Sequence, residues 1–118
     1  MSLSTHVLNA ANGVPAEGVK IELYSIDAEG NRGSLIKEVE TNNDGRVDQP
    51  LLSADETKTG TYELIFHIGD YFRKRGEKLP EPAFIDVVPL RFGIAEADKH
   101  YHVPLLASPW TYSTYRGS

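Results

Sequence analysis

The sequence contains no cysteine among its 118 residues, which excludes disulfide bonds, thiolate ligands and a cysteine nucleophile. It also lacks any apolar run near the roughly 20 residues that a transmembrane helix needs, so we expect no membrane partner. Basic residues are in deficit, because 12 Lys and Arg stand against 17 Asp and Glu for a net charge of −5. Nucleic-acid binding needs clustered basic side chains, whereas the one basic cluster, residues 73–75, is short and flanked by acidic residues. We therefore expect no nucleic acid as a partner.

The length and composition are typical of a single soluble domain. A chain of 118 residues is long enough for one core but too short for two. Hydrophobic residues make up 40% and charged residues 25% of the chain, the usual balance for a globular protein. The first ten residues have neither a basic start nor the apolar stretch of a secretion signal. We predict one domain over residues 1–118 and a cytoplasmic location, unless a leader has been removed.

Short segments of alternating apolar and polar residues predict an all-β protein with little helix. In 19–26 and 60–68 every second residue is apolar, as a half-buried strand requires. Further strands are expected at residues 3–8, 35–41, 84–94, 100–107 and 111–118. A short edge strand is expected at 51–52. Pro89 confines its strand to a sheet edge or a bulge. One short helix is expected at residues 70–77, with Asp70 as its N-cap. Seven or eight strands at this spacing predict an antiparallel β-sandwich.

A turn motif stands near the middle of the chain. Residues 42–45, Asn-Asn-Asp-Gly, form the strongest turn signal, because Asn and Gly tolerate positive φ. Arg46 follows this turn directly. An arginine in that place is usually exposed to solvent. If the turn aims it at a concave site, its planar fork can hold an oxyanion or a urea-like edge.

All four histidines lie on predicted strands. His100 and His102 are two residues apart, so they share one face of a strand at about 7 Å, and His6 lies in the first strand. His67 is expected to point to solvent and is given no role. The cluster can be a half-exposed surface pair, or three imidazoles could hold zinc. Because the sequence offers no obvious carboxylate partner for them, we expect no metal and no cofactor.

Three segments resemble the signature sequences of one family. Residues 100–118 read HYHVPLLASPWTYSTYRGS, residues 3–23 read LSTHVLNAANGVPAEGVKIEL, and residues 41–47 read TNNDGRV. They resemble, in order, the C-terminal, N-terminal and middle signatures of the 5-hydroxyisourate hydrolases, the transthyretin-related enzymes. The hormone carrier transthyretin resembles the chain in LLASPWTYST but lacks the matching histidines and the YRGS ending. The resemblance implies a transthyretin-like sandwich and an enzyme rather than a carrier.

The resemblance also implies a reaction, the hydrolysis of 5-hydroxyisourate in urate (purine) degradation. Water attacks the lactam carbonyl, and the ring opens to 2-oxo-4-hydroxy-4-carboxy-5-ureidoimidazoline. The family's working residues correspond to His6, Arg46, His102 and the tail, which makes Ser118 a catalytic candidate too. A histidine can take the proton from water near neutral pH, and we leave open whether His6 or His102 does so. Arg46 is expected to hold the substrate and the developing oxyanion.

The tail offers three further substrate-binding candidates, Tyr115, Arg116 and Gly117. Strand parity puts Tyr115 on the face of Thr111 and Ser113 and points Arg116 the other way, so Tyr115 is the stronger candidate. Gly117 permits a bend that brings the terminus back. The resemblance implies a homotetramer with sites at the dimer–dimer interface and a purine-derived small molecule as substrate. A carrier without turnover and a structural module of a larger assembly are the alternatives.

Overall fold

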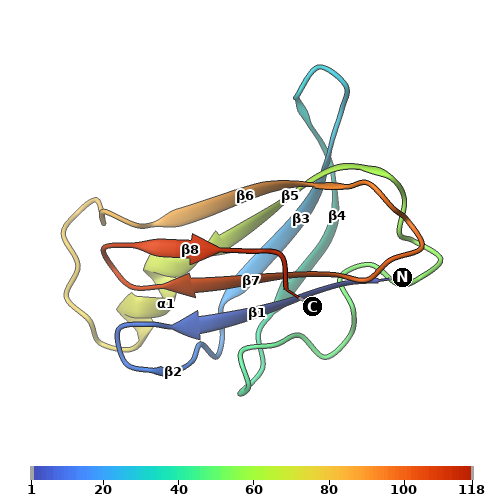
Figure 1. The fold of residues 1–118 in the computed structure, drawn as a ribbon. Helices are drawn as coiled ribbons and strands as arrows, with labels where there is room; N and C mark the ends of the chain where they lie inside the picture. The colour runs from blue at the N-terminus through green and yellow to red at the C-terminus, as the bar shows by residue number, and fades with distance from the viewer. Residues whose placement is uncertain (1, 118) are drawn as a thin grey trace.

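Two four-stranded sheets face each other in the computed structural model, which describes residues 2–117 (Figure 1). We name them sheet A, with the strand order β2-β1-β7-β8, and sheet B, with the order β4-β3-β5-β6. The strands are β1 (Leu3–Asn9), β2 (Val14–Pro15), β3 (Lys20–Ile26), β4 (Arg32–Glu40), β5 (Gly60–His67), β6 (Val87–Ile94), β7 (Tyr101–Ala107) and β8 (Tyr112–Thr114). One short helix, α1 (Ile68–Lys74), follows β5. Within the described residues, the expected sandwich of seven to eight strands with one short helix is confirmed.

Alternation along the strands builds the core between the two sheets. In β1 every odd-numbered residue is buried, and the even-numbered ones lie half-buried on the outer face of sheet A. β7 follows the same parity, except that Pro104 is buried as well. Fully buried side chains come from both sheets and the helix, among them Leu3, Ile21, Leu23, Leu64, Phe66, Phe72 and Leu105. Removing this apolar surface from water is the main driving force for folding. The outer face of sheet A carries Ser4, His6 and His102 together with the apolar Leu8, Pro104 and Leu106.

The pairing of β1 with β7 is parallel, whereas the other strand pairs within residues 2–117 are antiparallel. The predicted antiparallel sandwich thus contains one parallel pair, which the sequence analysis did not anticipate. Nearly the whole chain connects the two strands, so no short hairpin imposes the antiparallel direction. The parallel register sets Ser4 beside His102 and His6 beside Pro104. This pairing brings histidines from the two ends of the chain to one surface.

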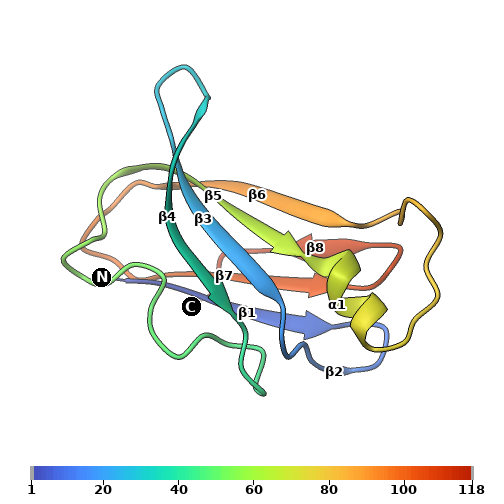
Figure 2. The same cartoon turned by 180° about the vertical axis from the view of Figure 1, so that it is seen from behind.

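The helix α1 begins two residues earlier than predicted. Its N-cap is His67, the last residue of β5, so the prediction that Asp70 caps the helix is wrong. Ile68 and Phe72, four residues apart, are both buried, and this spacing suits one face of a helix. Figure 2 shows α1 at the end of β5, on the side of sheet B. No helix in residues 2–117 is long and apolar enough to span a membrane.

Several strand boundaries also differ from the prediction. The strand expected from residue 84 begins at Val87, because the chain bends just before it and Phe84 is 71% exposed. The strand expected over 111–118 is regular only in β8. The expected edge strand at 51–52 is reduced to a single bridge with β1. Pro89 lies in the edge strand β6, as expected, since proline lacks the N–H group that a second neighbouring strand requires.

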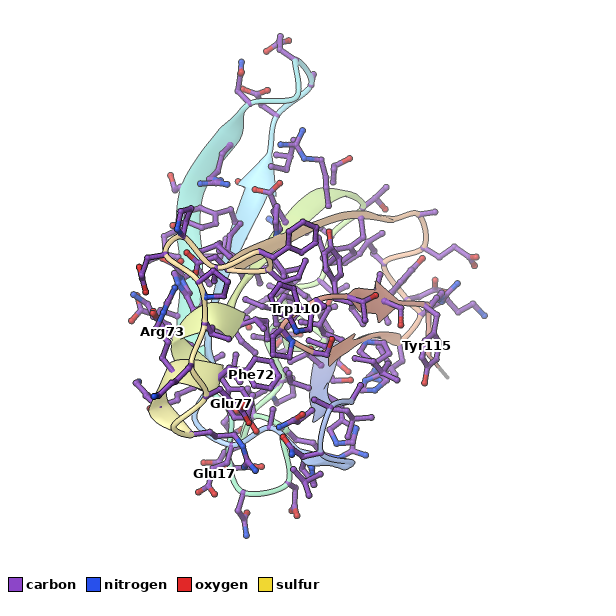
Figure 3. All side chains as sticks on the ribbon, turned by 90° about the vertical axis from the view of Figure 1, so that its left-hand side faces the viewer. Glu17, Phe72, Arg73, Glu77, Trp110 and Tyr115 are labelled. Atoms are coloured by element: carbon purple, nitrogen blue, oxygen red, sulfur yellow. The ribbon has the colours of Figure 1, made fainter. Side chains whose placement is uncertain are left out.

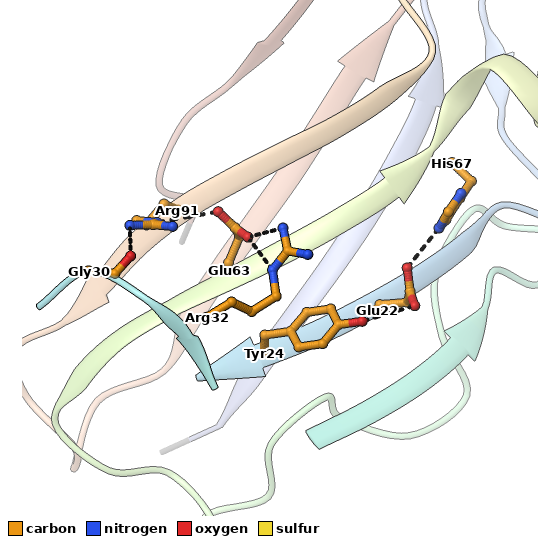
Figure 4. A network of polar contacts seen from close by, with 7 residues as sticks. All are labelled: Glu22, Tyr24, Gly30, Arg32, Glu63, His67 and Arg91. Atoms are coloured by element: carbon orange, nitrogen blue, oxygen red, sulfur yellow. Dashed lines mark hydrogen bonds and ion pairs between the residues drawn. The ribbon is translucent and has the colours of Figure 1, made fainter. Parts of the chain in front are cut away.

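A polar network covers the outer face of sheet B (Figure 4). The carboxylate of Glu63, only 7% exposed, accepts hydrogen bonds from Arg32 at 2.7 Å and from Arg91 at 3.3 Å. Nε2 of His67 lies 2.8 Å from a carboxylate oxygen of Glu22, so the expectation that His67 points freely to solvent is wrong. The hydrogen bond with His67 is the main cause that lowers the pKa of Glu22. This network joins β3, β4, β5 and β6 and occupies the sheet opposite the other three histidines.

Candidate active site

The outer face of sheet A carries histidines from both ends of the chain. Ser4 and His6 come from β1 and His102 comes from β7, and each is half-buried. Strand parity turns all three outward, because their neighbours in sequence belong to the core. Ser4 stands directly beside His102, and His6 is the next outward residue along β1. This register brings two histidines that are far apart in the sequence to one face of sheet A.

A backbone carbonyl orients the ring of His6. Its Nε2–H group donates to the carbonyl oxygen of Asp44 at 2.9 Å. A carbonyl oxygen can only accept, so in the neutral ring the proton is on Nε2 and the lone pair is on Nδ1. His6 can therefore accept a proton or a hydrogen bond at Nδ1.

The predicted turn at 42–45 is organised by the side chain of Asn42. Its Oδ1 atom accepts hydrogen bonds from the backbone N–H groups of Asp44 at 2.9 Å and of Arg46 at 3.2 Å. The backbone N–H of Gly45 donates to the Asn42 carbonyl at 2.9 Å. Such side-chain bonds to the following backbone are the reason that Asn favours turns. The turn holds Arg46 at a defined position.

This turn docks on β1 instead of closing a hairpin between neighbouring strands. The carbonyl of Gly45 accepts a hydrogen bond from the N–H of Val7 at 2.8 Å, and Arg46 forms an antiparallel bridge with His6. Arg46 is exposed. The bridge places Arg46 beside the strand that carries His6. It thereby joins residues 41–47 to the N-terminal segment.

Replacing Gly45 by alanine is expected to lower the free energy of unfolding by about 3 kcal/mol. Gly45 has φ +75°, and an added Cβ would collide with the carbonyl oxygen of Val7. The left-handed conformation accounts for about 1–2 kcal/mol of the loss, and the collision for the rest. Gly13→Ala is the matched control, since Gly13 has φ +70° and no atom within 4 Å of its added Cβ. Urea denaturation measures both variants, and equal losses would contradict the role given to the collision.

The ring of His102 is fixed on one side by Ser4. Ser4 Oγ lies 2.8 Å from Nδ1 of His102, so Nε2 is the nitrogen that can face a substrate. Burial is the largest cause of a pKa of His102 below 6.5, the value of an unperturbed imidazole. Nearby positive charges lower it further, those of Arg46, His100 and His6. His102 is therefore neutral near neutral pH and can act as a base.

The C-terminal tail returns along β7 to His102. The N–H of Gly117 donates to the carbonyl of His102 at 2.8 Å. A Cβ added to Gly117 would lie 2.5 Å from the His102 ring, so glycine is the residue that fits beside this ring. Ser118, expected to be catalytic, lies outside the described residues.

The other two tail candidates flank the start of β7. The guanidinium of Arg116 lies 4.1 Å from the ring centroid of Tyr101 and donates to the carbonyl of His100 at 3.3 Å. These contacts anchor the tail. Tyr115 is 61% exposed, and Figure 3 shows it on the side of the molecule away from the helix. A substrate contact by Tyr115 or Arg116 stays a prediction.

His100 lies beside His102 at the rim of the site. The two rings are stacked, with centroids 6.5 Å apart and planes inclined by 16°. His100 is exposed and precedes β7 by one residue, whereas the sequence placed it inside the strand. In the part of the chain that the structure describes, no group of three or more His, Cys, Asp or Glu side chains could hold a metal ion. The described residues therefore include no such group of ligands for the zinc ion considered above.

The candidate site lies on an open sheet surface. Cavities of about 500, 270 and 250 Å³ are lined by other residues, and His6, Arg46 and His102 are not among those. His6, Arg46 and His102 therefore lie outside these three cavities.

Three residues that hold the site were missed by sequence reasoning: Ser4, Asn42 and Asp44. Ser4 carried a readable signal, because it lies two residues before His6 and so shares its strand face. Asn42 was read only as part of a turn. Asp44 acts through its backbone carbonyl, which no side-chain pattern reveals.

Fold and site together define a class, a transthyretin-like β-sandwich that displays histidines and an arginine on an open sheet face. The sequence model of the HIUase/Transthyretin family matches residues 3–117, and the chain belongs to this family. The "5-hydroxyisourate hydrolase 2" of Rhizobium meliloti (strain 1021) is 64% identical over 98% of this chain and 95% of that protein. The "5-hydroxyisourate hydrolase" of Pseudomonas aeruginosa is 60% identical over 98% of this chain and 90% of that protein.

Solved structures agree with this placement. The 5-hydroxyisourate hydrolase of Klebsiella pneumoniae superimposes with a TM-score of 0.81 at 33% identity, over 99% of this chain and 98% of that chain. Sea bream transthyretin in complex with thyroxine superimposes with a TM-score of 0.85 at 25% identity, over 99% and 95% of the two chains. The fold is thus shared by proteins named as a hydrolase and by a transthyretin that binds a hormone, so the residues of the site must distinguish between the two activities.

Proposed function

We propose that this protein is a hydrolase that opens the lactam ring of 5-hydroxyisourate by histidine-assisted attack of water. Full-length relatives 64% and 60% identical carry the name of this activity. The observation that carries the proposal is the convergence of His6, Arg46 and His102 on one outer face from three distant stretches of chain. The proposed product is the ureidoimidazoline carboxylate of urate breakdown named above.

His102 is the proposed general base. Its lowered pKa keeps the imidazole neutral near neutral pH, and Ser4 engages Nδ1, so Nε2 is available to take a proton from water. His6 then holds the water or a substrate N–H group at Nδ1, because its Nε2–H is committed to the Asp44 carbonyl. The sequence left open whether His6 or His102 is the general base, and we propose His102 for this role.

Arg46 is the proposed anchor for the substrate and the oxyanion. Its guanidinium offers several N–H donors in one plane. The bridge to His6 places its backbone beside the base-bearing surface. Positive charge here stabilises the negative charge that develops on the attacked carbonyl oxygen. Tyr115, Arg116, Gly117 and Ser118 are proposed to complete the substrate contacts.

The open surface supports the proposal of a homotetramer with sites at the dimer–dimer interface. His6, Arg46 and His102 line none of the cavities of about 500, 270 and 250 Å³, although Tyr115 and Arg116 line the last of these. In this proposal a second subunit supplies walls around the three catalytic candidates. Trp110, 60% exposed at the turn between β7 and β8, is an apolar side chain that such a contact would cover. Light scattering of the purified protein tests this assembly. The single-domain organisation over 1–118 and the cytoplasmic location stay predictions.

Ultraviolet spectroscopy of urate with urate oxidase, in the presence and absence of this protein, tests the proposed activity. The hydrolase should speed the loss of the 5-hydroxyisourate signal in proportion to its concentration. A carrier would bind the intermediate and leave its decay rate unchanged or lower it, and that result would sink the proposed function. Full activity after exhaustive chelation is expected, because the chemistry assigned here uses only side chains and water.

The pH profile of kcat/KM should have its acid limb below pH 6.5. A base must be neutral to accept a proton, and the pKa of His102 is lowered from 6.5, first by burial and then by neighbouring positive charge. Activity should therefore rise as the pH rises through this lowered pKa and then become level. Steady-state rates across the range measure it. An inflection clearly above 6.5 would show that another group, or a differently placed His102, controls the reaction.

A further inference from the structure

Four side chains form an unbroken polar chain behind the proposed base. Ser2 Oγ lies 2.8 Å from Nδ1 of His100, and Ser4 Oγ lies 3.2 Å from Nε2 of the same ring. Ser4 Oγ also lies 2.8 Å from Nδ1 of His102. His102 is half-buried and His100 is exposed. The chain therefore runs from the site to the solvent.

The fold explains why one serine reaches both rings. The parallel register places Ser4 directly beside His102. His100 comes two residues before His102, and their rings stack with nearly parallel planes. Ser4 Oγ thus faces a nitrogen of each ring.

Proton counting allows two consistent directions in this chain, because a serine hydroxyl donates only one hydrogen. In one direction His102 donates from Nδ1 to Ser4, Ser4 donates to Nε2 of His100, and His100 donates from Nδ1 to Ser2. That direction leaves the Nε2 lone pair of His102 free to act as a base. The reverse direction leaves a proton on that nitrogen instead.

Resting on the proposed function, we propose that Ser4 and His100 are positioning residues that set the tautomer of His102 and carry its proton to solvent. Nε2 of His102 takes a proton from the attacking water. The Nδ1 proton of His102 passes to Ser4 Oγ, and the Ser4 hydroxyl proton passes to Nε2 of His100. His102 is then neutral with its proton on Nε2, and His100 carries the positive charge.

The reaction needs a path by which a proton leaves the site. Opening a lactam with water gives a carboxylate, so the leaving nitrogen keeps one proton of the water and the other must leave the site. Burial, and then the positive charges around His102, disfavour its protonated form and lower its pKa. The exposed ring of His100 can release the proton to water or to buffer. After the product leaves, water takes the Nε2 proton of His102. Ser4 returns its hydroxyl proton to Nδ1 of His102, His100 gives its Nε2 proton to Ser4, and Nδ1 of His100 takes a proton from solvent, which restores the first direction.

Nitrogen-15 NMR of the histidine rings tests the first part of the proposal without any need for activity. In the unmodified protein, neutral His102 should carry its proton on Nδ1. Ser4→Ala should abolish this preference, and Ser4→Thr, which keeps a hydroxyl, should retain it. Ser34→Ala is the matched control, because Ser34 lies exposed on β4 in sheet B. An unchanged His102 tautomer in Ser4→Ala would overturn the proposal.

Turnover measurements test the second part. Ser4→Ala and His100→Gln should lower kcat about tenfold while KM changes little, since water replaces a positioned proton-transfer group only in part. Added imidazole buffer should restore much of the lost kcat of His100→Gln and leave the unmodified enzyme unaffected. A purely structural role predicts no rescue by buffer, and that outcome would overturn the proton path. If the unmodified protein shows no hydrolysis, the proposed function fails, while the NMR result still decides the tautomer.

Discussion

Replacing His102 by asparagine should lower kcat/KM for 5-hydroxyisourate by about a hundredfold to ten-thousandfold, the range that a positioned general base contributes. The asparagine side chain can keep a hydrogen bond to Ser4 where Nδ1 stood. It has no atom that replaces Nε2, the nitrogen assigned to the proton of the attacking water. The variant therefore removes the base and keeps the hydrogen bond with Ser4. Decay of the intermediate, followed by ultraviolet absorbance, measures the loss.

His67→Asn is the matched control for this experiment. His67 lies at the end of β5 in sheet B and contacts Glu22, so the same chemical change there should leave kcat/KM within about twofold, as expected for a site remote from the chemistry. Equal losses in the two variants would indicate that asparagine acts through general destabilisation. A His102 variant with full activity would remove this residue from the mechanism.

Replacing Arg46 by glutamine should lower kcat/KM by about a hundredfold to a thousandfold, the loss typical of one oxyanion donor. Glutamine keeps polarity and an approximate length but removes the charge and the planar fork of donors. The backbone bonds of the turn, from Arg46 to Asn42 and through the bridge to His6, do not depend on the side chain. The loss should therefore appear in rate while the free energy of unfolding stays nearly unchanged.

Two further arginine variants sharpen this test. Arg46→Lys keeps the charge without the fork, so an intermediate loss would show that the fork matters beyond the charge. Arg75→Gln is the control, because Arg75 lies at the C-terminal end of α1, where its guanidinium packs over Tyr71. Its activity should match that of the unmodified protein. Full activity in Arg46→Gln would contradict the assignment of the oxyanion to this residue.

The catalytic candidates were readable from the sequence because each lies in a short local pattern. His6 and His102 lie within segments that the sequence predicted as strands, and His102 is two residues from His100, a spacing that puts both on one strand face. Arg46 follows a turn that its Asn and Gly residues predict. The family signatures then joined these three positions, and the match over residues 3–117 confirms that family. Helix and strand ends were less accurate, as at Asp70, because capping and bending depend on contacts made outside the segment.

The sequence by itself determined where the central turn lies and that strands would form a sandwich around an apolar core, although it misjudged the exposure of His67. Only the tertiary structure decided which strands became neighbours. A period of two is the same for parallel and antiparallel pairing, so alternation cannot reveal that β1 runs parallel to β7 or that Ser4 stands beside His102. The docking of Gly45 on Val7 was equally hidden, since it joins residues far apart in the chain through backbone atoms alone. The face of a strand to which a side chain points follows from the local sequence, whereas the strand that lies beside it follows from the packing of the whole fold.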